Sequence, residues 1–457
     1  MRNHKLVAAL LGGPILTLSP GTWATEGLRL EGYGAISRAM GGTAMAQDAG
    51  VAGIMSNPAT LSIAPQGSRF TVGADVITAR IVNEDLVTGE RSRTSDSGKN
   101  RGPYVAPQLG YSLTRGAWSL GTGAFALGGL GTEYGRQGFL SEGSSGAATG
   151  LDNSSRLLVV DIPFALSYRF NDRLTVGASI DAVWSGLNLN MLLGANQVGG
   201  LIADGRVEGS LLGTLSTLPA LDGAHLGLTR DHPVSSGADA WGLGGRVGMT
   251  WALTEDTRVG AAYNFATRLN DLSGDATLTA VDQVAGQIPI SGRVRIVDFQ
   301  MPASFGAGVT HKVDENWSLS LDISRVLWRD VVKDLDVRFS SNEGDDLNLE
   351  IPQNYKNQTI VGVGTAYRLG DWVLRGGYRH GTQVVPDRDL FVTLPVTPTR
   401  ILSAGVSYQP SPRSRVDFAY SHNLEIDRTN PGNSNTGNPV RTRESQNNFV
   451  FSYTLSF

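Results

Sequence analysis

Cysteine is absent from the 457 residues of this chain, so neither disulfide bonds nor thiolate metal ligands can contribute to its structure or chemistry. Charge of one sign is not in excess either, since 38 basic residues stand against 42 acidic ones and no basic stripe runs along the sequence. Nucleic acid is therefore not an expected partner, because its phosphates need a strongly positive surface. Beyond the first residues, no stretch approaches the roughly 18 apolar residues of a membrane-spanning helix.

Motifs of catalysis and cofactor binding are also missing. No HExxH, Walker, GxGxxG or GxSxG pattern occurs, and the six histidines are scattered along the chain. A barrel enzyme would need a serine or aspartate beside a histidine near the membrane rim, and His311, His380 and His422 have no such company in the sequence. The sequence predicts a protein that is not an enzyme and that holds no metal or cofactor.

The start of the chain is predicted to be a signal peptide. Met1–Lys5 is basic, Leu6–Leu18 is an apolar run, and the segment ends in the small residue Ala24. We expect residues 1–24 to be removed on export and the mature chain to begin at Thr25.

Strict alternation of apolar and polar residues is the main signal in the rest of the chain. Within 155–170, one set of alternate positions is apolar and the other is mostly polar or small, with Asp161 and Ser167 among the second set. Successive side chains of a strand point to opposite faces, and in a membrane barrel one face meets lipid while the other meets the lumen. The apolar set is predicted to face lipid.

About fourteen such segments lie between residues 67 and 457, an even number as bacterial barrels require. Their connections alternate between short turns, such as 254–256, and longer polar stretches, such as 83–102 and 189–239. A soluble sandwich can also alternate, but it has no reason to sort its loops by length. We therefore predict an all-β fold, a 14-stranded antiparallel transmembrane β-barrel with long external loops, in the bacterial outer membrane. The final Phe457 is typical of the signal that barrels present to their insertion machinery.

Residues 25–66 do not alternate. They are rich in glycine and alanine, with apolar groups such as Val51–Met55 that would be unfavourable in water. A disordered periplasmic tail is the alternative, but the apolar content favours a mostly helical plug inside the lumen.

Several motifs in this region carry a family resemblance. Glu31-Gly32-Tyr33-Gly34, Ser37 to Gly42, Asp48-Ala49 and Asn57-Pro58-Ala59 follow one another in order, and Gly129 to Tyr134 continues the match. The chain resembles the FadL/TodX family of outer-membrane transporters of long-chain fatty acids and aromatic hydrocarbons. The resemblance implies passive, plug-gated uptake of a hydrophobic small molecule that leaves sideways through the barrel wall.

Two sites follow from the resemblance. Asn57, Pro58 and Ala59 match the motif that holds the plug against the wall. A kink in the third strand of the family opens the wall, and the corresponding residues here are Ala126, Gly128, Gly129 and Gly131. Glycines favour bulges and bends, although an ordinary strand end running into a glycine-rich loop is the alternative.

A ligand pocket is expected between the new N-terminus and the loop 189–239, whose apolar residues are too many for a solvated loop. The pocket residues that we predict are Thr25, Leu28, Leu189, Met191, Leu192, Leu201 and Ile202. These side chains could instead simply pack on one another in two short helices that cap the barrel.

The nature of the ligand is less defined by the sequence. No cation follows Trp184, where fatty-acid transporters have one, which favours a neutral hydrocarbon, although Arg325, Arg329 and Lys333 remain candidate partners for an anion. A general porin for polar solutes is the rival function. We expect a monomer surrounded by outer-membrane lipid and lipopolysaccharide.

Overall fold

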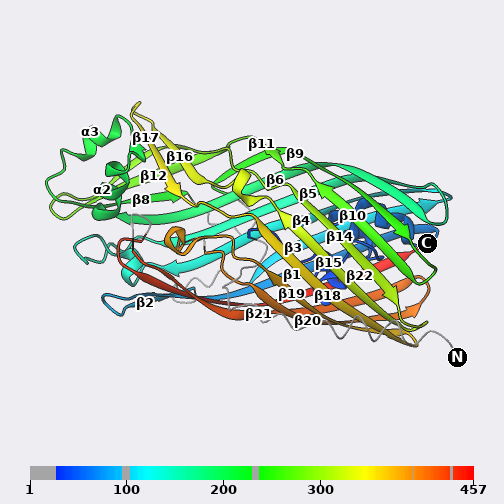
Figure 1. Ribbon diagram of the computed structural model, residues 1–457. Coiled ribbons are helices and arrows are strands. Elements are labelled where there is room, and N and C mark those ends of the chain that lie inside the picture. The colour runs from blue at the N-terminus through cyan, green and yellow to red at the C-terminus, as the bar shows by residue number, and fades with distance from the viewer. Residues whose placement is uncertain (1–26, 95–102, 229–235, 394, 433–435) are drawn as a thin grey trace.

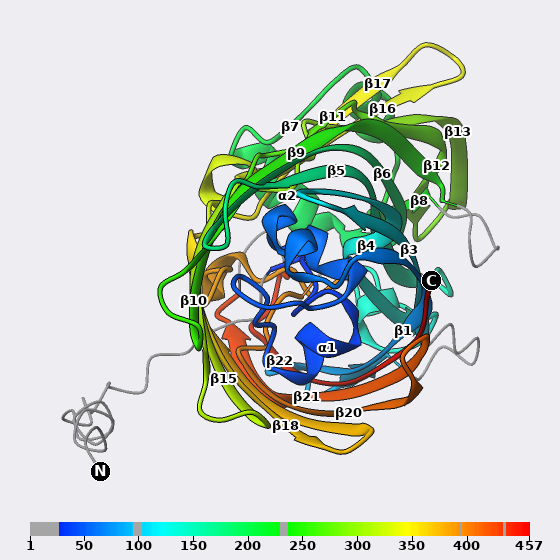
Figure 2. The same cartoon turned by 90° about the vertical axis from the view of Figure 1, so that its right-hand side faces the viewer.

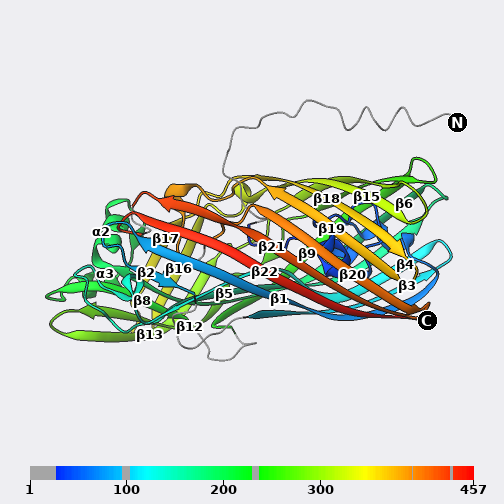
Figure 3. The same ribbon diagram turned by 90° about the horizontal axis from the view of Figure 1, so that it is seen from below.

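The computed structural model describes residues 27–94, 103–228, 236–393, 395–432 and 436–457. These residues form one antiparallel sheet of 22 strands that closes into a barrel, because β1 (Gly67–Asp85) pairs with both β3 (Tyr104–Arg115) and β22 (Val440–Ser456). Figure 3 shows β1 and β22 side by side along the wall. The all-β barrel is therefore confirmed, and the predicted residues 1–24 and Thr25 lie outside the described residues.

The strands tilt strongly across the barrel (Figure 1). Up to the middle of the chain the remaining strands are β2 (Arg91–Arg93), β4 (Trp118–Gly135), β5 (Asn153–Arg169), β6 (Leu174–Gly194), β7 (Val207–Glu208), β8 (Leu221–Leu228), β9 (Ala238–Ala252), β10 (Thr257–Asn264), β11 (Arg268–Leu269) and β12 (Leu272–Asp282). They are followed by β13 (Gly286–Val297), β14 (Ser304–Lys312), β15 (Trp317–Val326), β16 (Asp334–Ser341), β17 (Asp346–Pro352), β18 (Gln358–Leu369), β19 (Trp372–Gly381), β20 (Arg400–Ser411) and β21 (Ser414–Asn430).

The predicted count of fourteen strands is wrong. Residues 257–279 alternate as one of the fourteen segments, but the structure breaks them into β10, β11 and β12. The chain changes partners within this stretch: β10 pairs with β9 and β14, whereas β12 pairs mainly with β8 and β13. The predicted loop 189–239 contains the end of β6 and the strands β7 and β8. The alternation of apolar and polar residues continues through such breaks, so it does not reveal where a strand ends and the next one begins.

Apolar side chains cover the outside of the barrel. Phe164, Ile180 and Leu402 are each at least half exposed, whereas Asp161 and Ser167 on the opposite face are buried. This arrangement is the reverse of a water-soluble protein and is typical of a barrel whose outer face contacts lipid. Among the described residues, no helix combines the length and apolar character needed to cross a membrane.

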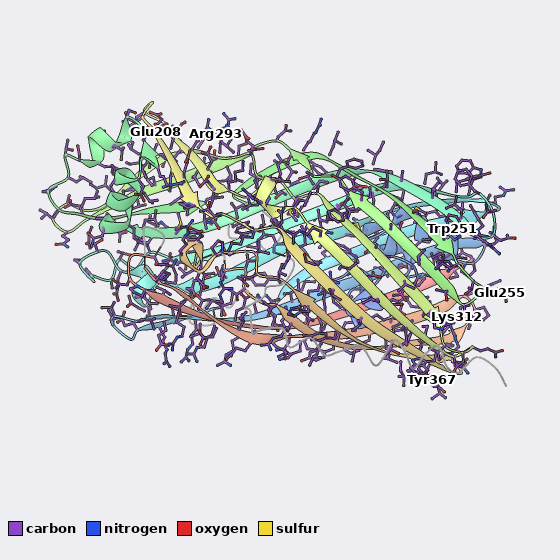
Figure 4. The ribbon with its side chains drawn as sticks, in the orientation of Figure 1. Glu208, Trp251, Glu255, Arg293, Lys312 and Tyr367 are labelled. Carbon is purple, nitrogen blue, oxygen red and sulfur yellow. The ribbon has the colours of Figure 1, made fainter. Side chains whose placement is uncertain are left out.

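Aromatic side chains gather on the outside near the short turns, and we call them the aromatic girdle. Trp118 packs on Tyr168 with ring centroids 4.5 Å apart, and Trp372 stacks on Tyr408 at 4.4 Å. Figure 4 places Trp251 and Tyr367 at this end of the barrel and Glu208 and Arg293 at the other. Such girdles mark the membrane interface in outer-membrane barrels. The girdle therefore places the short turns at one membrane surface and the long connections beyond the other.

Residues 27–66 fill the lumen near the short turns (Figure 2). They contain one short α-helix, α1 (Gly34–Ala39), and two 3-10 helices, η1 (Val51–Met55) and η2 (Pro58–Ile63). The prediction of a mostly helical plug is wrong, because Gly41, Gly42 and Gly50 have positive φ angles that end or prevent helices between these pieces. The remaining helices lie in other connections: η3 (Phe139–Ser141), α2 (Ala195–Ala203), α3 (Leu211–Leu215), η4 (Trp328–Asp330) and η5 (Asp387–Asp389).

Candidate functional site

Asn57 joins two parts of the plug to the barrel wall. Its fully buried side chain donates to the backbone carbonyls of Met45 at 2.8 Å and of Met249, on β9, at 3.0 Å. Its Oδ1 accepts from the backbone N–H of Ala59 at 3.0 Å and so caps η2, which Pro58 begins with its preset φ angle. The predicted motif residues Asn57, Pro58 and Ala59 thus lie together at a contact between plug and wall.

Glycines in the wall make this close contact possible. A Cβ atom at Gly248 would overlap Oδ1 of Asn57, and one at Gly177 would lie 2.5 Å from the backbone nitrogen of Ala59. Any side chain at these wall positions would push the plug away from β6 and β9. Part of the high glycine content of the chain therefore serves the packing of the plug.

A buried ionic cluster holds the other side of the plug. The Arg38 guanidinium of α1 pairs with Glu31 at 2.6 Å and with Asp75 of β1, and all three side chains are buried. Burial lowers the pKa of Arg38, but the two carboxylates outweigh it and raise that pKa above its ordinary value. Glu31 also accepts from Ser421 at 3.0 Å and from Asn448 at 3.1 Å. The contacts with Asp75, Ser421 and Asn448 exist only while plug and wall are in contact.

Asp48 supplies a further ionic contact between plug and wall. It pairs with Arg69 of β1 at 2.8 Å. Burial alone would raise the pKa of Asp48, but the Arg69 and Arg415 guanidinium groups hold it below its ordinary value. Asp48 therefore stays charged at neutral pH and keeps this contact.

The wall is interrupted between β3 and β4. These strands pair from Arg115 and Trp118 to Leu109 and Ala124, and beyond that point the described residues of β4 pair only with β5 and the start of the plug. The ladder between β4 and β5 shifts register between Ala126 and Gly128. The predicted residues Ala126, Gly128, Gly129 and Gly131 all lie in this stretch of β4, whose edge toward β3 is open.

The segment Gly27–Leu30, which we call the N-terminal segment, covers the open edge of β4. Leu30 N–H donates to the Leu127 carbonyl at 3.2 Å, and Gly129 N–H donates to the Leu28 carbonyl at 2.9 Å. A Cβ atom at Gly128 would overlap the Leu28 carbonyl oxygen. The glycine at this position thus allows the N-terminal segment to dock on the wall.

An apolar cavity of about 50 Å³ lies on one side of the N-terminal segment, and Leu28 faces it. Most of its lining is aliphatic or aromatic, and its ionisable side chains are two aspartates and a tyrosine. The lining residues are Leu28, Leu157, Leu187, Leu272, Ile296, Val297, Asp298, Phe299, Val331, Val332, Asp334, Leu335, Gln353 and Tyr355. Neither lysine nor arginine is among them, so the cavity suits a neutral apolar molecule.

A second, more polar cavity of about 50 Å³ lies on the wall side of the same segment. It is lined by Gly27 and Arg29, and also by Tyr104, Gly129 and Gly131 at the interruption of the wall. The N-terminal segment thus contributes residues to both cavities. Its beginning is held in place where Gly27 packs against the fully buried ring of Trp328 on η4.

Only Leu28 of the predicted and described pocket residues lines the apolar cavity. Leu189 and Met191 of β6 and Leu201 of α2 are buried in the same extended hydrophobic region without lining the cavity. Leu192 of β6 is buried but is not part of that region, and Ile202 is 44% exposed. Sequence reasoning missed Leu157 and Leu187, which face each other across β5 and β6. Leu157 lies on the same inward face of β5 as Asp161. An apolar residue on this mostly polar face was the signal in the sequence that could have indicated the cavity.

Comparisons with known proteins agree with this architecture. A family model described as outer membrane protein transport protein (OMPP1/FadL/TodX) matches residues 27–457. The toluene transporter TodX of Pseudomonas putida is 39% identical, with a TM-score of 0.84 over 94% of this chain and 99% of that chain. The toluene transporter TbuX of Ralstonia pickettii is 41% identical, with a TM-score of 0.80 and the same coverage.

More distant relatives point the same way. Outer membrane protein P1 of Haemophilus influenzae is 23% identical over 401 residues, which are 84% of this chain and 82% of the relative. The long-chain fatty acid transport protein of Escherichia coli K12 is 22% identical over 306 residues, 64% of each chain. With a family model that matches residues 27–457, this chain belongs to the OMPP1/FadL/TodX family of outer-membrane transport proteins.

Proposed function

We propose that this protein is a passive channel through which neutral hydrophobic molecules, above all aromatic hydrocarbons, cross the outer membrane. The observation that carries the proposal is the position of the N-terminal segment between an apolar cavity and an interrupted barrel wall. The toluene transporters among the similar structures support an aromatic substrate. We propose that the chain acts as a monomer, since the sheet closes within one chain.

Ligand entry must widen the apolar cavity. Its volume of about 50 Å³ is well below the roughly 150 Å³ of an engineered protein cavity that binds benzene. Leu28 is the lining residue that belongs to the plug, and moving it requires the N-terminal segment to move. Binding and opening are therefore coupled through Leu28.

Opening the segment toward the wall has a modest energetic cost. Two backbone hydrogen bonds hold it on β4, and the Arg29 guanidinium donates to the Ser304 hydroxyl at 2.8 Å, each bond contributing about 1 kcal/mol net. Burying roughly 200 Å² of apolar ligand surface stabilises the bound state by about 5 kcal/mol at 25 cal/mol per Å². The ligand can thus offset the cost, and it would then leave between β3 and β4 into the lipid rather than into water.

Fatty-acid carboxylates fit this cavity poorly. Asp298 and Asp334 line it, and no lysine or arginine does. A carboxylate placed there would lose its hydration and gain no cationic partner from the lining, because Asp298 is acidic and Asp334 already pairs with Arg206 at 2.8 Å. We therefore propose a neutral substrate. Tight binding of a fatty acid would contradict this proposal.

Replacing Leu187 with tryptophan tests the cavity. The larger side chain should fill the space opposite Leu157 and lower toluene binding to the purified protein in nanodiscs at least tenfold. Leu402→Trp on the lipid-facing side of β20 is the matched control and should bind normally. Equal binding by Leu187→Trp, or palmitate binding as tight as toluene binding, would contradict the proposal. Ion conductance without toluene binding would favour a porin.

A second variant tests the exit. Gly128→Ala should force the Leu28 carbonyl away from β4 and loosen the N-terminal segment, so that toluene equilibrates across proteoliposome membranes several times faster. Gly376→Ala on β19 is the control, because a Cβ there meets nothing closer than 3.9 Å. An unchanged rate in Gly128→Ala would place the exit elsewhere.

A further inference from the structure

A groove runs along the outer, lipid-facing surface of the barrel over β9, β10, β14 and β15. Ala261 and Ala307 face each other directly across β10 and β14 and form its floor. The larger side chains of Met249, Tyr263 and Ile323 line it. It has a volume of about 1050 Å³, and we call it the outer groove.

The outer groove continues along the strands toward the short turns. A second hollow of about 410 Å³ shares Ala261, Ala307 and Ile323 with it and extends to Val259 and Leu321. From Leu321 to Arg325, four residues of β15 span about 13 Å at 3.3 Å per residue. The groove is therefore long, narrow and almost entirely apolar, a shape that suits an acyl chain.

Arg325 lines the end of the groove that lies away from the short turns. Phe305 and Thr359 lie directly opposite it on the two neighbouring strands, and its guanidinium donates to the Thr359 hydroxyl at 2.6 Å. Within the described part of the chain, Arg325 has no ion pair with an acidic side chain. A half-buried guanidinium at the end of an apolar groove suits an anionic group at that position.

The height of Arg325 agrees with a lipid headgroup. It follows Trp317 of the aromatic girdle by eight residues, which is about 26 Å along the strand and about 20 Å along the barrel axis at a tilt near 40°. The apolar band of such barrels is about 25 Å tall. Arg325 therefore lies near the outer boundary of the band, where the phosphate groups of outer-leaflet lipids are found.

Two further cations lie beyond Arg325. Arg329 on η4 is exposed, and its backbone N–H donates to Asn357 Oδ1 at 3.0 Å, next to the exposed Lys356. Asp330 is the one acidic residue within 325–330 and 356–357, against Arg325, Arg329 and Lys356, so positive charge is in excess there. Basic side chains at this boundary attract phosphorylated lipids.

We propose that the outer groove is a binding site for a phosphate-bearing lipid of the outer leaflet, of the lipid A type. One acyl chain lies over Ala261 and Ala307, and a phosphate contacts Arg325 with Arg329 and Lys356 nearby. The site is on the outside of the wall and does not depend on the proposed uptake function.

Native mass spectrometry of the purified full-length protein titrated with diphosphorylated lipid A tests the site. Ala307→Leu, which fills the floor, and Arg325→Gln, which removes the charge, should each lower lipid A binding at least fivefold. Ala404→Leu on the lipid-facing side of β20 and Arg115→Gln near the short turns are the controls, and both should bind normally. Toluene binding should be unchanged in all four variants.

Lipid A without its phosphates should bind at least fivefold more weakly to the wild-type protein and equally well to wild type and Arg325→Gln. Binding that is the same with and without phosphates would overturn the assignment of Arg325. Normal lipid A binding by Ala307→Leu would show that the acyl chain lies elsewhere and would overturn the proposal that the outer groove is the binding site.

Discussion

Replacing Arg38 with methionine is expected to detach the plug from the wall while the barrel stays folded. Arg38 neutralises Glu31 and Asp75, and its loss leaves two buried carboxylates without their cation. Breaking a buried ion pair in this way costs about 3–5 kcal/mol. The strand ladder is not touched by the change, so the loss should appear in the docking of residues 27–66.

Limited proteolysis of the plug and ion conductance through planar bilayers would measure this detachment. Wild-type plug should resist cleavage, and the variant should be cut rapidly and leak ions. The double variant Arg38→Met with Asp75→Asn should recover part of the loss, because Glu31 keeps its bonds to Ser421 and Asn448. Arg91→Met, which breaks a surface pair with Glu84, should leave the plug resistant to cleavage and is the control. A protected plug in Arg38→Met would refute the proposed anchor.

Replacing Asn57 with alanine should slow hydrocarbon uptake severalfold in a folded barrel. The change removes the cap of η2, at about 1 kcal/mol, and leaves the Met45 and Met249 carbonyls without this donor, at about 1 kcal/mol or more each. A loss of about 3 kcal/mol lets the whole plug shift and moves the Leu28 side chain away from the apolar cavity, so the ligand binds less well and uptake slows. Gly128→Ala, in contrast, loosens only the backbone contact of the N-terminal segment with β4.

Uptake of labelled toluene by cells that express equal amounts of folded protein would test this expectation. Asn57→Asp keeps an acceptor for Ala59 but turns a buried carboxylate oxygen toward the Met45 and Met249 carbonyls, so it should lose at least as much uptake as Asn57→Ala. Asn83→Ala changes a buried asparagine of β1 outside the plug contacts described above and is the control. Wild-type uptake in Asn57→Ala would show that the plug motif has no part in transport.

The fold could be predicted in part from the sequence. Alternation within single segments was sufficient for an all-β barrel and for the direction of each face, as the exposed Phe164 and the buried Asp161 show. The number of strands was predicted wrongly, because β10 and β12 belong to one alternating segment but pair with different strands. Helix content in the plug was also overestimated, since the positive φ angles of Gly41, Gly42 and Gly50 interrupt the helical pieces and are not visible in the sequence.

The candidate site was also predicted only in part from the sequence. The motif around Asn57 and the glycines of β4 were found through a resemblance, and the structure places both at contacts with the plug. Of the described residues predicted for the pocket, Leu28 lines the cavity and those of 189–202 do not. The other walls are formed by Leu157 and Leu187 and by residues of β12, β13 and the segment after β15. The sequence alone did not show whether the apolar residues of this stretch, which was predicted to be a loop, face a cavity or one another.

Local side-chain chemistry alone determined that this chain forms strands with one apolar and one polar face, because alternation needs no partner to be recognised. The interruption between β3 and β4, the N-terminal segment that covers it and the cavity behind Leu28 were decided only by the tertiary structure. They depend on the register of strands and on contacts such as Leu30 with Leu127 and Gly27 with Trp328, which join residues far apart in the chain. Hydrogen bonds and steric fit across such separations leave no regular pattern in a single sequence.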